Sequence, residues 1–220
     1  MDKHNVNSET NVMTLDPNKI PHVLLEGEMG AVLEWKLTDN KTGKATASGQ
    51  RRAESFVKQF PQLLMSLFQQ TYLVGDAISI KDTGNTARDV RSRSPNFGAD
   101  AGVGAVTHGI IVGTGSTAPT INDYVMETPI AHGTGAGQLS YGAVTWGTPA
   151  YDATTSQFTI TRNFANSSGG TITINEIGLY VTAWDTAVKY FMVLRDKITG
   201  GIAVPTGQTL TVNYRLQGVI

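Results

Sequence analysis

The sequence predicts a mainly β fold: an antiparallel β-sandwich with one amphipathic, Pro-interrupted helical segment and an extended N-terminal arm. Three observations predict this fold class. Glycine occurs 24 times in 220 residues and separates short segments rich in Thr, Val and Ile, as tight turns separate strands. Residues 53–70 repeat their apolar side chains at helical intervals, whereas residues 1–22 are polar and follow neither the helical nor the strand period.

The composition favours contacts with other proteins. Charged residues make up 16% of the chain, below the roughly 25% usual in soluble domains. The net charge is −1, which offers no attraction to phosphate or to a membrane surface, so we expect neither nucleic acid nor membrane as a partner. Cysteine is absent, which excludes disulfides and thiolate chemistry. The polar N-terminus does not resemble a signal peptide, and we expect the chain to fold in the cytoplasm.

We divide the sequence into three parts. Residues 1–22 form the arm, residues 23–105 hold a β-hairpin, the helix and a long loop packed on the sandwich, and residues 106–220 form the sandwich, which we interpret as an assembly module. The arm cannot build a core of its own, so it is either a disordered tail or a segment that becomes ordered on a neighbouring subunit. In the second case the interface candidates are Val12, Leu15 and Ile20.

The second part begins with a hairpin and a helix. Apolar residues alternate around Trp35 and turn-forming residues occupy 39–43, which predicts a β-hairpin over residues 29–50. The helix follows over residues 53–70. Because Pro61 lacks a backbone N–H, we expect a kink or a break near Phe60, with a second helical piece beginning at Pro61.

A strand over residues 72–81 and a turn over 82–85 lead into a long connection. Residues 85–105 lack any period, so we expect an irregular loop. This loop is either solvated or in contact with acidic residues of a neighbouring subunit, and its interface candidates are Arg88, Arg91, Arg93 and Phe97. Three arginines without interleaved aromatic residues are too few to predict nucleic-acid binding.

Six strands are expected in the third part, joined by turns rich in glycine. They cover residues 106–112, 137–146, 157–165, 171–181, 190–197 and 208–217. In the last of these strands four apolar residues share one parity and predict a buried face: Leu210, Val212, Tyr214 and Leu216.

The strand over 171–181 changes phase, because its apolar residues have even numbers before residue 175 and odd numbers after residue 176. A β-bulge at residues 175–176 explains the change. The bulge would turn Glu176 towards the interior or a sheet edge, where an unpaired carboxylate is costly. Arg162 and Arg195 lie on neighbouring expected strands, so we predict a pair between Glu176 and an arginine that locks the structure.

Motifs for catalysis are weak in this sequence. Residues 113–117 and 133–137 are glycine-rich, but strands and loops follow them, whereas a phosphate-binding loop opens a helix. The histidines at positions 4, 22, 108 and 132 lack the spacing of metal ligands, and no Gly-x-Ser-x-Gly motif occurs. A pair of catalytic carboxylates would require the fold to bring two of 18 acidic residues together. We therefore expect no catalytic residue, no cofactor, no metal site and no enzymatic role.

Several segments, in this order and spacing, resemble a β-sandwich module of tailed-bacteriophage structural proteins. They are residues 110–119 (IIVGTGSTAP), 123–130 (DYVMETPI), 158–160 (FTI), 175–180 (NEIGLY), 194–196 (LRD) and 204–212 (VPTGQTLTV). Modules with these GTGSTAP and NEIGLY motifs are similar to those of tail-fibre, tail-collar, capsid-decoration and other minor virion proteins. The resemblance covers about residues 27–217 and implies assembly, with no catalytic residues to carry over.

The resemblance implies a non-enzymatic structural component of a virion, assembled in the host bacterial cytoplasm as a homo-oligomer in contact with other virion proteins, such as a tail or major capsid protein. We expect a tail-associated position, as in a fibre or baseplate attachment protein. Two alternatives stay open: a capsid decoration or cement protein that stabilises the head shell, and a receptor- or glycan-binding module. The aromatic candidates for a glycan site are Tyr141, Trp146, Tyr151 and Trp184.

Overall fold

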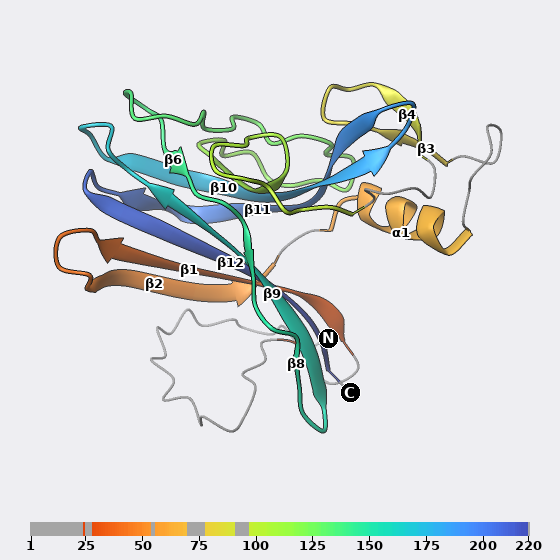
Figure 1. The fold of residues 1–220 in the computed structure, drawn as a ribbon, viewed down its shortest axis with the longest axis horizontal. Coiled ribbons are helices and arrows are strands. Elements are labelled where there is room, and N and C mark those ends of the chain that lie inside the picture. The colour runs from red at the N-terminus through yellow and green to blue at the C-terminus, as the bar shows by residue number, and fades with distance from the viewer. Residues whose placement is uncertain (1–23, 25–27, 54–55, 70–77, 91–96, 220) are drawn as a thin grey trace, which may run out of the picture.

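The computed structural model describes residues 24, 28–53, 56–69, 78–90 and 97–219. Two antiparallel sheets pack face to face and make a sandwich (Figure 1), which confirms the predicted mainly β fold. The larger, seven-stranded sheet has the order β2-β1-β12-β9-β6, with β7 and β8 also paired to β9. Its strands are β1 (Met29–Asp39), β2 (Ala45–Arg52), β6 (Ser140–Tyr141), β7 (Thr145–Trp146), β8 (Ala150–Tyr151), β9 (Thr155–Ala165) and β12 (Gln208–Val219).

The smaller sheet has three strands in the order β11-β10-β5. Its strands are β5 (Gly109–Gly113), β10 (Ile172–Trp184) and β11 (Val188–Val204). A separate hairpin consists of β3 (Ile78–Lys81) and β4 (Ala87–Val90). Apolar side chains from the seven-stranded and the three-stranded sheet fill one continuous core. Leu210, Val212 and Tyr214 are buried in it, as the alternation in β12 predicts. We call the core-facing side of each sheet its inner face.

The β1–β2 hairpin is part of the sandwich, whereas the sequence predicted a segment packed on it. The strand β1 pairs with the last strand β12 along its whole length, from Met29 opposite Gly218 to Asp39 opposite Gln208. The division at residue 106 therefore does not follow the sheet, because β12 needs β1 on one side and β9 on the other to complete its hydrogen bonds.

The described residues contain one helix, α1 (Gln59–Gln69), and it is shorter than predicted. Pro61 lies in its first turn, where no backbone donor is needed, so the helix begins there. The expected helical start near residue 53 is wrong for Phe56 and Val57. Phe56 forms a β-bridge with Leu194, and the Val57 N–H donates to the carbonyl of Val193 at 3.2 Å.

Several strand boundaries also differ from the prediction. The connection over 85–105 contains β4, which pairs with β3 even though its residues show no alternation of polar and apolar side chains. The strand expected at residue 106 begins at Gly109, and within residues 137–146 only the short strands β6 and β7 form. Both differences occur beside glycine-rich turns, where the chain leaves the extended conformation: Gly104, Gly109 and Gly137 have positive φ.

Part of the sequence prediction lies outside the described residues. This holds for the N-terminal arm with Val12, Leu15 and Ile20, for Arg91 and Arg93, and for the start of the strand expected at residue 72. In the part of the chain that the structure describes, no helix has the length and apolar character needed to cross a membrane.

Candidate functional site

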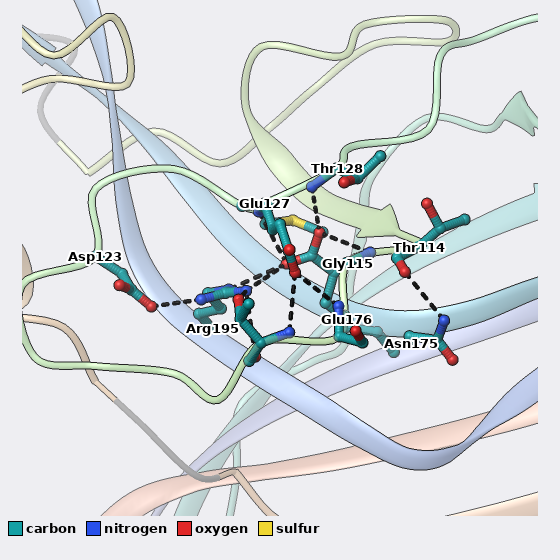
Figure 2. Close-up of polar contacts among 12 residues, drawn as sticks. Thr114, Gly115, Asp123, Glu127, Thr128, Asn175, Glu176 and Arg195 are labelled. Atoms are coloured by element: carbon teal, nitrogen blue, oxygen red, sulfur yellow. Dashed lines mark hydrogen bonds and ion pairs between the residues drawn. The ribbon is translucent and has the colours of Figure 1, made fainter.

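The predicted β-bulge is present in β10 and places Glu176 at the centre of a buried polar network. The register between β10 and β11 shifts between Ile174 and Glu176. Glu176 is fully buried on the side of the three-stranded sheet that faces away from the core, beneath the 114–130 segment (Figure 2). A carboxylate in such a place requires several donors to offset its lost hydration.

Glu176 receives those donors from Arg195 and from the backbone above it. The Nε of Arg195 donates to Oε2 of Glu176 at 3.0 Å, which is the pairing predicted from the sequence. The second oxygen, Oε1, accepts from the backbone N–H of Thr128 at 2.7 Å and of Gly115 at 3.2 Å. The N–H of Glu127 donates to Oε2 at 3.1 Å, so one side chain fastens two stretches of the loop to β10 (Figure 2).

Arg195 extends the network to a second carboxylate, on Asp123. Its Nη1 lies 2.6 Å from Oδ2 of Asp123, and its Nη2 donates to the hydroxyl of Thr117 at 3.0 Å. Burial alone would lower the pKa of Arg195, but the hydrogen bond to Asp123 and the charge of Glu176 outweigh it and raise that pKa above its usual value. The guanidinium is therefore a permanent cation between two anions.

The loop over 114–130 has further internal support. Oε2 of Glu127 accepts from the backbone N–H of Ser116 at 2.7 Å and of Thr117 at 2.9 Å, and these bonds lower the pKa of Glu127. The Nδ2 of Asn175 donates to the Thr114 carbonyl at 3.0 Å (Figure 2). The glycine-rich GTGSTAP segment thus binds side chains of its own chain.

Glycine is required in that segment because the backbone approaches Glu176 closely. A Cβ atom added to Gly113 would lie 2.6 Å from Oε1 of Glu176, and one added to Gly115 would also collide with it. The close approach is what allows the Gly115 N–H to donate to the carboxylate.

Arg162 does not join this network, so the predicted alternative pairing with Glu176 is wrong. Arg162 lies on the inner face of β9, whereas Glu176 lies on the far side of the other sheet. The fully buried Arg162 guanidinium donates instead to five backbone carbonyls, those of Gly102, Ala105, His108, Ile110 and Gly142, at 2.6–3.2 Å. Burial lowers the pKa of Arg162.

The two interface candidates within the described residues both make contacts inside the chain. The Nε of Arg88 lies 2.6 Å from Oδ2 of Asp82, in the turn that joins β3 to β4. Phe97 is half-buried and packs edge-on against Phe60, with 5.9 Å between the ring centroids. Arg88 is therefore held within its own hairpin, and Phe97 is held against α1.

The aromatic candidates for a glycan site do not form one surface. Tyr141 is buried in the core, and its hydroxyl donates to the Ile130 carbonyl at 2.7 Å. Trp146 and Tyr151 are exposed on β7 and β8, and Trp184 is half-buried at the end of β10. Within the described residues, no group of three or more His, Asp or Glu side chains is placed to hold a metal ion.

The sequence prediction missed other members of the buried polar set. Asp123 was not predicted to contact Glu176 or Arg195, although its place in the DYVMETPI segment could have suggested contact with the other motifs. A second buried carboxylate, Asp196, lies on the inner face of β11 and accepts from the Tyr214 hydroxyl at 2.7 Å. An acidic residue directly after Arg195 in an apolar strand was its one signal in the sequence.

The fold and the site together define a mainly β sandwich whose sequence motifs meet in a buried ionic network. No family model, no curated protein and no solved structure matches the chain. The network consists of one bulged strand, one arginine and one loop, which are held together by two ion pairs and a set of backbone hydrogen bonds.

Proposed function

We propose that the chain is a non-enzymatic structural component of a tailed-bacteriophage virion, associated with the tail and assembled through contacts with other virion proteins. The observation that carries the proposal is the convergence of motifs. Residues from GTGSTAP and DYVMETPI, which share one loop, contact residues from the distant NEIGLY and LRD segments around Glu176 and Arg195. These motifs are the ones that resemble phage structural modules, and their common role here is to hold a loop rigidly on a sheet.

A rigid loop supports a structural role because repeated subunits must present the same surface in every copy. The donors and acceptors around Glu176 are directed at one another, so the geometry of the network favours stability of the fold over chemistry on a ligand.

The test is to purify particles from lysed cultures of the bacterium whose genome carries the coding sequence. Particles are separated on a density gradient, and the chain is quantified by mass spectrometry against the shell-forming protein. We expect the chain to sediment with DNA-filled particles at a fixed ratio. A chain that stays entirely in the soluble fraction contradicts the proposal.

The same measurement separates the tail from the capsid. A tail-associated part is present in few copies per particle, whereas a decoration or cement protein approaches the copy number of the shell protein. A glycan-binding role is tested separately on a glycan array, where the Trp146→Ala variant serves as the control for binding through the exposed aromatic residues.

A further inference from the structure

One end of the seven-stranded sheet extends beyond the sheet that covers it. Figure 1 shows β8 and the start of β9 projecting away from β10 and β11. Strand pairing places the residues of this end in cross-sheet rows. The outermost inner-face row contains Met29, Gly218, Ser156 and Tyr151, and the next contains Ala31, Leu216 and Phe158. We call these two rows, together with Trp146 on β7, the overhang.

The inner face loses its cover row by row towards the sheet end. In the row that lies one step deeper, Leu33, Tyr214 and Ile160 are buried, and Trp146, opposite Ile160 at the end of that row, is 50% exposed. In the next row outwards Ala31 is still buried, but Phe158 is 37% exposed. In the outermost row, Met29 is 81% exposed and Tyr151 is 82% exposed. Large apolar side chains on an uncovered sheet face mark a contact surface.

The overhang combines projecting side chains with a hollow. An apolar cavity of about 240 Å³ opens between the two sheets where the overhang begins. Phe158, Leu216 and Trp146 line it from the larger sheet, and Leu179 and Val193 line it from the smaller one. Met29 and Tyr151 project from the same face beside it. A surface that bears both a hollow and apolar projections can fit a copy of itself.

Leu24, the first described residue, lies on the other face of the larger sheet. Leu24 packs against Val32 and Val219, which lie on the face opposite the inner face. Leu24 therefore lies behind the overhang, on the opposite face of the sheet.

We propose that the overhang is the surface through which two copies of this chain associate, inner face against inner face. All residues of the overhang are uncharged, so two copies bring no like charges together and leave no carboxylate or ammonium group unpaired. Packing sheet against sheet is how the rest of this face is already covered. The inference deepens the proposed structural function, because it names the homo-oligomer contact of the assembling subunit.

The test uses the full chain, purified and examined by sedimentation velocity over a range of concentrations. We expect a concentration-dependent dimer. Met29→Asp and Tyr151→Asp should each weaken dimerisation by about a hundredfold, because a carboxylate would lose its hydration in the contact. Both side chains are largely exposed in the single chain, so its thermal unfolding should change little.

Val103→Asp is the matched control, since Val103 is 78% exposed but lies outside the overhang. A monomeric wild-type chain, a dimer that survives both overhang substitutions, or a dimer that Val103→Asp weakens equally overturns the inference. The particle experiment is independent of these outcomes. If the chain is monomeric in solution but present in particles, only this inference is contradicted. If the chain dimerises but is absent from particles, only the proposed function is contradicted.

Discussion

At the scale of single residues, Glu176 binds two stretches of the 114–130 loop to the sheet. Its carboxylate accepts hydrogen bonds from three backbone N–H groups, contributed by residues on both halves of that loop, and pairs with Arg195. Replacing a buried, fully paired carboxylate leaves its donors unsatisfied, and this costs more than the net contribution of the pair itself.

Glu176→Gln should therefore lower the free energy of unfolding by about 3–5 kcal/mol. An amide has one acceptor oxygen, so its NH₂ group would face donors of the loop. The measurement is urea unfolding of wild type and variant at neutral pH.

The matched control for this prediction is Glu28→Gln. Glu28 also pairs with an arginine, Arg52, at 2.8 Å, but the Arg52 side chain is 53% exposed and the Glu28 side chain 27% exposed, so we expect a loss of about 1 kcal/mol or less. Equal unfolding midpoints for Glu176→Gln and wild type would show that the network contributes nothing to stability. An Arg195→Ala variant should lose as much as Glu176→Gln, because it breaks the same pair.

Asp123 makes the same network sensitive to acid. Burial raises the pKa of Asp123, but hydrogen bonds from Thr120 and Arg195 outweigh it, so the pKa lies below the ordinary value of 3.8. A carboxyl whose pKa is depressed by folding stabilises the fold fully above its unfolded pKa, and this contribution disappears as the pH falls through the folded pKa.

We expect Asp123→Asn to be less stable than wild type at pH 7, with the difference shrinking as the pH falls below about 4. Unfolding midpoints measured at intervals between neutral and strongly acidic pH test this expectation. If the two curves of stability against pH run parallel, Asp123 does not titrate in the folded state as described.

At the scale of elements, Arg162 joins the two sheets through backbone carbonyls. It extends from β9 and holds the residues around the start of β5, where the chain makes a glycine-rich turn and offers its carbonyl groups inwards. A guanidinium can serve this arrangement because it carries five N–H donors in a fixed plane.

Arg162→Lys should not preserve this contact, since an ammonium carries three donors on a single atom and cannot span five carbonyls. We expect a loss of about 3 kcal/mol in the free energy of unfolding and faster hydrogen exchange in residues 102–110. Arg52→Lys is the control, because Arg52 is exposed and makes a surface pair with Glu28. Unchanged exchange in residues 102–110 would contradict the assigned role.

The elements differ in how far the sequence could predict them. Strands β9 and β12 and the bulge before Glu176 could be predicted, because alternation of apolar residues directly reports which side of a sheet is buried. The β3–β4 hairpin lacks that signal, since β4 is short and polar. Likewise, Arg162 and Arg195 lie on strands that neighbour β10 in the sequence, so both were candidates for the ion pair with Glu176. Only the structure distinguishes them, because β9 and β10 belong to different sheets.

At the scale of the whole molecule, the N-terminal arm gives a direct test of assembly. Deleting residues 1–22 removes no described contact of the core, so we expect the truncated chain to fold with a thermal unfolding midpoint close to that of wild type. Incorporation into particles should be lost or weakened, as measured by complementation of a deletion mutant followed by mass spectrometry of the particles. Full incorporation of the truncated chain would show that the arm makes no contact needed for assembly.

The pairing of β1 with β12 has a consequence for biosynthesis. The strand β1 hydrogen-bonds along its full length with β12, so the larger sheet stays incomplete until residues 208–219 have left the ribosome. Contacts between such distant parts of a polypeptide are slow to form, and β1 must wait on the nascent chain with its hydrogen-bonding edge open. A chain that ends before residue 208 lacks β12, the partner of both β1 and β9, and we expect it to aggregate through those two open strand edges.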